Sequence, residues 1–355
     1  MRQSLRSLGA SGDTLSFVEK AHRAGTSRVY DYKWSRWESW CRDKKVRPLR
    51  PFAVQLANFL ADLAAQQNLS SPTVKVFHAA IVSTIKQRGG RVRGTSSRPR
   101  LIQDVLKGIS SSYAASPRRV PLWDLFLVLD SLRSAPFEPL NEASRFYLTL
   151  KTVFLVTLAS GRRSSGVNGL SGLPQDVCRD RDGSFLLHFL PEFRAKNQAD
   201  SDPSPVVRIP PLSSILADDY DDVRLCPVRA LRRYLAVTSP TRPVGARKLF
   251  LSVNSNFKKD ISANTLARWL RTVVQLAYGR EGLPLPQARA HEIRAWSASI
   301  TAARNMPLTD ILQAAYWKSE DTFINFYLRD CALTRGDGSH GISSLVAAQR
   351  PLRLQ

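Results

Sequence analysis

Apolar residues recur at helical spacing through the first third of the chain, and this periodicity limits what that region can fold into. Helices are predicted over residues 27–41, 51–66 and 71–87. In the second of these, the apolar positions fall on one side: Val54, Leu56, Ala57, Leu60 and Leu63. Ser71 as N-cap, with Pro72 at the first helical position, is predicted to begin the third. Residues 1–113 are therefore expected to form a helical domain with a core of its own.

A segment rich in proline and arginine, Ala114 to Pro121, interrupts this pattern and has the composition of an interdomain linker. Beyond it, apolar helical stretches occupy 122–132 and 144–159, and helices are expected again over 290–305 and after Pro307. Between them, 185–190 and 206–209 predict two short strands joined by a polar connection. The expected fold is mainly α with a small β-sheet, in which residues 122–355 form a second, α+β domain.

Positive charge dominates the composition, with 52 Lys and Arg against 29 Asp and Glu and a formal net charge of +23. Such an excess favours a polyanionic partner, although charge alone does not distinguish DNA from RNA or an acidic membrane. Cations cluster after the third predicted helix, where clustered charge would be rewarded on nucleic acid by counterion release. The residues predicted to bind DNA are Lys86, Arg88, Arg91, Arg93, Arg98 and Arg100. A solvated loop is the alternative for this segment.

The sequence contains no motif that predicts a cofactor site, a metal site or a membrane-spanning segment. No apolar run approaches the roughly 20 residues that cross a bilayer, and the first residues lack the apolar stretch of a secretory signal, so an intracellular protein is expected. The cysteines have no paired spacing and are expected to be buried free thiols: Cys41, Cys178, Cys226 and Cys331. An acidic run over 218–222 is expected to be solvated rather than to bind a metal. No cofactor and no metal are therefore predicted.

Six residues follow one another in an order that suits phosphodiester chemistry: Arg163, Lys196, His291, Arg294, Trp317 and Tyr327. Two guanidiniums can bind the non-bridging oxygens of a phosphate and offset the charge that rises there in the transition state. A hairpin lysine can give a proton to a leaving 5′ oxygen, and an indole N–H can donate without titrating. A tyrosine can attack the phosphorus and keep the energy of the broken strand in a covalent ester, without ATP.

Each of these residues also has a plain structural interpretation. A double arginine after an apolar helix is usually surface charge, and a hairpin lysine is usually exposed. Trp317 and Tyr327 could be core aromatics, and His291 a partly buried core histidine. His291 and Arg294 are three residues apart in a predicted helix and are expected on one face, where one phosphate could meet both. The ordered set as a whole is what favours a catalytic site.

These residues resemble the motifs of the tyrosine recombinase family, which includes phage integrases and the recombinases of DIRS-type and Ngaro-type retrotransposons. The segment 157–165, Thr-Leu-Ala-Ser-Gly-Arg-Arg-Ser-Ser, is similar to the first arginine box, and His291-Glu-Ile-Arg294 to the His-x-x-Arg box. Lys196 is similar to the β-strand lysine, Trp317 to the family's His or Trp, and Tyr327 to the nucleophile. The aromatic-rich N-terminal third looks like the core-binding domain of the retrotransposon branch. Two positions depart from the pattern: Gly166 replaces a common acidic residue, and Trp317 and Tyr327 are one residue further apart than usual.

The resemblance implies a helical domain and a catalytic domain that clamp double-stranded DNA, with 3′-phosphotyrosine intermediates, no metal, and exchange of strands by a homotetramer. It also implies a nuclear location and an apolar tail, 342–348, that docks on a neighbouring subunit. A second hypothesis, raised by the two departures, is a catalytically silent, domesticated DNA-binding protein that keeps the clamp. A third is an RNA-binding helical protein, which the cationic faces alone would allow.

Overall fold

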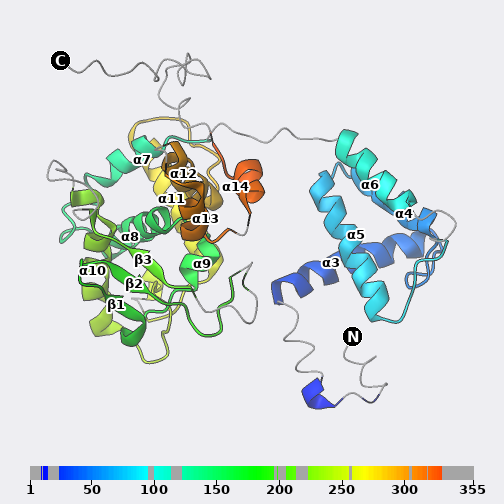
Figure 1. Cartoon of the computed structure of the whole chain (residues 1–355), viewed down its shortest axis with the longest axis horizontal. Helices are drawn as coiled ribbons and strands as arrows, with labels where there is room; N and C mark the ends of the chain where they lie inside the picture. Colours follow the sequence, from blue (N-terminus) through cyan, green and yellow to red (C-terminus); the bar gives the residue numbers. More distant parts are fainter. Residues whose placement is uncertain are drawn as a thin grey trace. The chain divides into compact units, whose positions relative to one another are not determined.

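The computed structural model describes residues 9, 11–14, 24–94, 100–112, 122–195, 198, 205–212, 223–255, 258–303, 306–317 and 319–329. The chain divides into two compact units, Met1–Ser116 and Pro117–Gln355. The first contains α3 to α6, and the second contains α7 to α14 with three strands (Figure 1). This confirms a mainly helical fold with a small β-sheet. The expected linker, 114–121, lies outside the described residues.

The helices of the N-terminal unit are α3 (Ala24–Asp43), α4 (Ala53–Ala65), α5 (Ser71–Gln87) and α6 (Leu101–Ser112). The helices expected from apolar periodicity correspond to α3, α4 and α5. Two details were wrong. Val54 is 52% exposed, because it points away from the buried face of α4, which begins at Ala53 and continues with Leu56 and Ala57. The N-cap of α5 is Ser70, and the hydroxyl of Ser71 instead shares a hydrogen bond of 2.8 Å with that of Ser110 in α6.

Aromatic side chains fill the core of this unit. Trp37 stacks on Trp40, with ring centres 5.4 Å apart, and meets Phe59 edge-on at 5.1 Å. Both indoles find hydrogen-bond acceptors: Trp37 Nε1 donates to the Pro48 carbonyl at 3.1 Å, and Trp40 Nε1 to Asp62 at 2.9 Å. Aromatic contacts of this kind contribute beyond the area they bury, and they fix α3 against α4.

The helices of the C-terminal unit are α7 (Leu125–Leu132), α8 (Arg145–Ser160), α9 (Ser164–Asn168), α10 (Pro227–Thr238), α11 (Ala263–Arg280), α12 (Ala290–Ala303), α13 (Leu308–Ala315) and α14 (Glu320–Phe326). Helix α8 is buried along most of its length and packs against α10, α11 and α12. It is apolar on all sides, which is the pattern of a helix inside a core. Its buried charge is Lys151, whose ammonium pairs with Glu138 and donates to the Leu132 carbonyl at 2.8 Å.

A three-stranded antiparallel sheet, ordered β1-β2-β3, covers part of this core: β1 (Val177–Arg179), β2 (Phe185–Leu187) and β3 (Val207–Ile209). The two expected strands correspond to β2 and β3, which pair with Phe185 opposite Ile209. Strand β1 was not predicted, because its three residues, Val-Cys-Arg, show no alternation. The sheet matters for the site because residues of the β2–β3 connection reach it.

The cysteines agree in part with expectation. Cys41 and Cys226 are buried free thiols, whereas Cys178 on β1 is only half-buried, so its predicted burial was wrong. Burial, followed by the nearby charge of Glu38, raises the pKa of the Cys41 thiol to about 12. Cys331, the acidic run and the apolar tail lie outside the described residues. No helix in the described part of the chain has both the length and the apolar character to cross a membrane.

Candidate active site

The end of α8 delivers two arginines to the site. The helix stops at Gly161, which adopts a left-handed conformation with φ +57° as the C-cap residue. Such a position favours glycine, and it turns the chain out of the helix axis. Arg162 and Arg163 follow directly, and Arg163 serves as the N-cap residue of the short helix α9. The end of a buried helix therefore fixes the backbone positions of both arginines.

Arg294 lies inside the protein, on α12. Its side chain is 1% exposed, and its guanidinium donates a hydrogen bond of 2.7 Å to the Ala315 carbonyl at the end of α13. The indole ring of Trp317 covers it, with 4.1 Å between Cζ and the ring centre, and the ring of Tyr327 lies at 5.2 Å. The Nε atom of Arg294 has no hydrogen-bond partner among the described residues. This guanidinium is thus held by two aromatic faces and one carbonyl, with donor capacity left over.

Trp317 and Tyr327 belong to a small separate core beneath Arg294. Trp317 is 6% exposed, and its ring centre lies 5.4 Å from that of Phe323 and 4.8 Å from that of Tyr327. Helix α14, which Ser319 precedes as predicted, places Tyr327 at its end, where the Tyr327 carbonyl accepts a hydrogen bond of 3.2 Å from Ser299 on α12. The extra residue between Trp317 and Tyr327 therefore leaves the two rings in contact.

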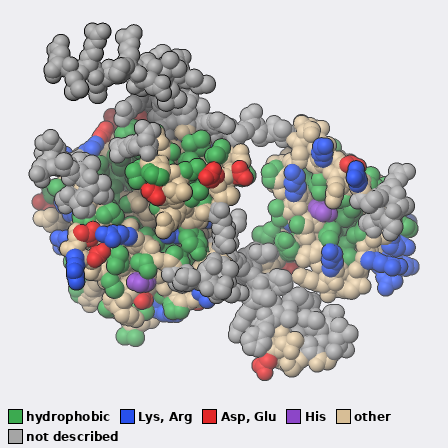
Figure 2. Space-filling model, in the orientation of Figure 1, with side chains coloured by type: hydrophobic (Ala, Val, Ile, Leu, Met, Phe, Trp, Pro, Cys, Tyr) green, Lys and Arg blue, Asp and Glu red, His purple; other side chains and the backbone are tan. Residues whose placement is uncertain are grey.

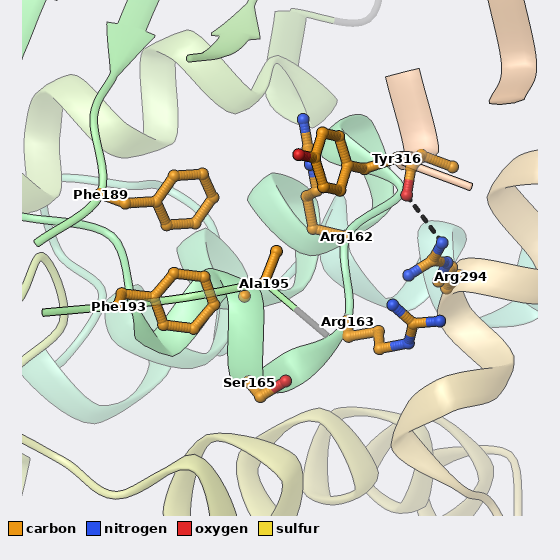
Figure 3. A pocket seen from close by; sticks show the side chains of 10 residues that line it. Arg162, Arg163, Ser165, Phe189, Phe193, Ala195, Arg294 and Tyr316 are labelled. Atoms are coloured by element: carbon orange, nitrogen blue, oxygen red, sulfur yellow. Dashed lines mark hydrogen bonds between the residues drawn. The ribbon is translucent and has the colours of Figure 1, made fainter. Parts of the chain in front are cut away.

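One open pocket collects the cationic groups (Figure 3). Arg162, Arg163 and Arg294 line it, and its other walls come from aromatic, small and backbone groups: Ser165, Gly166, Phe189, Phe193, Ala195, Ala315 and Tyr316. No acidic side chain is among these described lining residues. Arg163 and Arg294, which were predicted to act together, thus share a pocket. Arg162 and Tyr316 were not predicted to be part of it.

The cationic side chains in this pocket repel one another. Burial, followed by the nearby charge of Arg163, lowers the pKa of Arg294 to about 9; Tyr327 acts in the opposite direction, and Arg162 adds a smaller lowering. Burial also lowers the pKa of Arg162, while Tyr316 acts in the other direction. Like charges concentrated in a concave, partly dry site attract an anion strongly. The pocket is therefore suited to hold a phosphate.

His291 lies at the start of α12, one turn before Arg294, but it is exposed and is not among the described residues that line the pocket. Partial desolvation of the imidazole lowers its pKa, Glu292 opposes this, and the cations Arg289 and Arg329 add to it. A neutral imidazole is therefore favoured at neutral pH. The spacing of three residues predicted a shared helix face, whereas the structure buries one residue and leaves the other at the surface.

No protein-family model matches the sequence, and no curated protein is similar enough in sequence to match it. Solved structures do match. A lambda integrase dimer bound to a COC′ core site has a TM-score of 0.53 at 14% sequence identity, over 96% of this chain and 97% of that chain. The chain has the fold of a tyrosine recombinase. The Tn1549 transposon integrase in complex with transposon right end DNA has a TM-score of 0.50 at 15% identity, over 80% of this chain and 84% of that chain.

Lys196, similar to the β-strand lysine of tyrosine recombinases, lies outside the described residues. Its chain neighbour Ala195 lines the pocket and donates its backbone N–H to Gln198 at 3.1 Å. The role of Lys196 stays a prediction.

The cationic segment of the N-terminal unit begins at the end of α5 and is held in place by its backbone. Arg91 N–H donates to the Leu49 carbonyl at 3.0 Å, and Gly90 comes so close to this carbonyl that an added Cβ would stand 2.2 Å from it. Lys86, Arg91 and Arg100 are exposed. Figure 2 shows Lys and Arg side chains gathered at one edge of this unit.

Two of the other predicted DNA-binding residues are already engaged with the protein. Arg88 lies 4.8 Å from the ring centre of Trp34 and pairs with Glu38 at 3.5 Å, and Arg93 lies 4.0 Å from the ring centre of Phe52. Arg98 lies outside the described residues. Within the part of the chain that the structure describes, no group of three His, Cys, Asp or Glu side chains could hold a metal ion.

Proposed function

We propose that this chain cleaves and rejoins double-stranded DNA through a covalent 3′-phosphotyrosine at Tyr327, without metal or ATP. The observation that carries the proposal is the shared pocket of Arg163 and Arg294, with Trp317 and Tyr327 packed on the Arg294 guanidinium. Two guanidiniums at one phosphate suit a transition state whose oxygens gain negative charge. The fold of a tyrosine recombinase supports the same chemistry.

In this mechanism the phenol of Tyr327 gives up its proton to water, and its oxygen attacks the phosphorus. The bond from phosphorus to the 5′ oxygen then breaks, and Lys196 supplies the proton that this leaving oxygen takes. Arg163 and Arg294 bind the non-bridging oxygens of the phosphate. Trp317 donates its indole N–H to a phosphate oxygen, and neutral His291 contacts the same phosphate. Because the phosphotyrosine keeps the energy of the broken strand, the reverse attack by a 5′ hydroxyl rejoins DNA.

The two departures from the family pattern leave room for this chemistry. A Cβ atom added at Gly166 would meet only Arg162 Cβ, at an ordinary distance of 3.6 Å, so the backbone at this position does not require glycine. The longer spacing before Tyr327 still leaves its ring 4.8 Å from that of Trp317. Both facts favour an active enzyme over a silent DNA-binding protein.

A nicked duplex that loses its short leaving strand traps the covalent intermediate and tests the proposal. Wild-type protein, offered a pool of nicked duplexes of varied sequence, should accumulate protein–DNA adducts, and Tyr327→Phe should form none while binding DNA equally well. Tyr147→Phe is a matched control, because this tyrosine packs on Phe137 away from the pocket. Adducts that persist in Tyr327→Phe would refute the nucleophile. Binding without adducts in the wild type would instead establish the silent DNA-binding protein.

The finer assignments rest on the same proposal. The N-terminal unit would bind DNA phosphates through Lys86, Arg91 and Arg100, and protomers would assemble on DNA, as the lambda integrase does in its dimer on a core site. From the sequence resemblance we further propose that the protein acts as a tetramer, that it belongs to the DIRS- and Ngaro-type branch, and that it is located in the nucleus. Equal affinity for duplex RNA and duplex DNA would contradict a clamp built for B-form DNA.

A further inference from the structure

Arg162 is a buried cation that the mechanism above does not use. Its side chain is 9% exposed, and its Nε atom has no hydrogen-bond partner among the described residues. No described carboxylate pairs with it, and its guanidinium lies 5.1 Å from the ring centre of Tyr316. A buried charge without a counter-ion is unfavourable unless a ligand supplies the missing partner. The orientation of Arg162 toward the pocket indicates where that ligand enters.

The charge balance of the pocket leads to the same point. Arg163 and Arg294 alone can offset one phosphodiester, whose transition state carries about two negative charges spread over its oxygens. A third guanidinium is surplus for that single group. Figure 3 shows the guanidiniums of Arg163 and Arg294 close together, whereas that of Arg162 runs along the Tyr316 ring and away from them. The pocket thus has two separate cationic positions.

Tyr316 is held in an unusual backbone conformation beside Arg162. Its φ is +58°, in the left-handed region, where residues with a side chain are disfavoured and where glycine is the usual choice at a helix C-cap. Strained positions of this kind persist where the surrounding structure fixes them and are concentrated at functional sites. The conformation places the phenol ring in the pocket wall, against the guanidinium of Arg162.

We propose that Arg162 and the hydroxyl of Tyr316 form a second anion subsite, which binds the phosphate next to the one held by Arg163 and Arg294 on the same DNA strand. This inference rests on the proposed function, because it takes the scissile phosphate to lie at Arg163 and Arg294. Successive phosphates of one strand follow each other closely along the duplex, so neighbouring groups can enter a single pocket. Gripping both would fix the strand on each side of the reacting phosphorus, which positions the reacting atoms.

Neutral phosphates in the nicked duplex test this subsite. Replacing a phosphate that flanks the scissile one by a methylphosphonate removes its charge, and on one side this should slow adduct formation by wild-type protein about tenfold, as expected for a lost charged contact. Arg162→Gln should cause a similar loss on the unmodified duplex and no further loss on the sensitive methylphosphonate duplex. Arg232→Gln, at an exposed position on α10, should keep the full sensitivity. Independent, multiplying losses for Arg162→Gln and the methylphosphonate would overturn the subsite.

A second measurement needs no DNA. Calorimetry with inorganic phosphate and pyrophosphate as probes should show tighter binding of pyrophosphate to wild-type protein, and Arg162→Gln should reduce this preference whereas Arg232→Gln should not. Arg162→Lys, which keeps the charge, and Tyr316→Phe, which keeps the ring, should each reduce it partly. An Arg162-dependent preference without any adducts would retain the subsite and overturn the recombinase function. Adducts combined with an unaltered preference in Arg162→Gln would retain the function and overturn the subsite.

Discussion

Arg294 should make the free protein less stable than it would be with an apolar residue in its place. Burial and the charges of Arg163 and Arg162 lower the pKa of Arg294 to about 9. At about 1.4 kcal/mol for each pKa unit, the charged form then costs on the order of 5 kcal/mol of folding free energy. The hydrogen bond to the Ala315 carbonyl and the contact with Trp317 return about 3 kcal/mol of this. The balance is a net penalty of about 2 kcal/mol.

Replacing Arg294 with methionine, which has a similar length, should therefore stabilise the free protein by about 2 kcal/mol, as seen when buried charges give way to apolar groups. For a unit of this size, Tm should rise by about 4 to 8 °C, measured by calorimetry on the transition of the C-terminal unit. Arg232→Met, at an exposed position on α10, should leave Tm unchanged. The same Arg294→Met protein should form no adducts with a nicked duplex.

The pH dependence of this effect has a definite sign. A cation whose pKa is lowered by folding binds its proton more tightly in the unfolded state, so the penalty is fully present below about pH 9 and fades as pH rises above it. The stability gap between Arg294→Met and wild type should narrow over that range. A lower Tm for Arg294→Met at pH 7 would refute the reasoning, because it would mean that the packing and the hydrogen bond outweigh the buried charge.

Three further perturbations test other parts of the molecule. Lys151→Met should lower the free energy of unfolding by about 3 to 5 kcal/mol in a denaturant titration. The buried Glu138 pairs with Lys151 and Arg229, and the substitution removes the first of these cations. An unchanged denaturation midpoint would contradict this expectation. The imidazole of His291, followed by NMR, should titrate below its ordinary pKa of about 6.5, and stability should fall as pH drops through that value, because the unfolded chain takes up the proton first. Arg91→Gln should weaken DNA binding evenly across sequences and reduce the salt slope of log K by about 1, and an unaltered slope would exclude a phosphate contact at this residue.

The sequence allowed α3, α4 and α5 to be predicted because burial of one face sets the period of their apolar residues, whereas α6 (Leu101–Ser112) was not predicted as a helix. Helix α5 has the predicted bounds, Ser71–Gln87, since proline fixes its start and glycines follow its end. Strand β1 was missed because three residues are too few to show alternation. Its place is decided by pairing with β2, in which Val177 lies opposite Leu187, and such pairing is not encoded locally.

Part of the candidate site was also predicted from the sequence, and part of it was not. Chemistry and order selected Arg163, Arg294, Trp317 and Tyr327, but a sequence does not tell which of two adjacent arginines turns inward. The left-handed turn at Gly161 directs both Arg162 and Arg163 toward the pocket. A double arginine after an apolar helix carried a signal for both, and it was attributed to Arg163 alone.

The packing around Arg294 explains how three like charges can stay together without a bound anion. The rings of Trp317 and Tyr327 lie against the guanidinium, so that aromatic faces offset part of the cost of burying its charge. A phosphate that enters the pocket takes over that compensation, and its negative charge relieves the repulsion between Arg294 and its neighbours. The unfavourable free energy of the clustered charges in the free protein is then recovered when a phosphate binds, which links the predicted charge penalty at Arg294 to the affinity of the pocket for an anion.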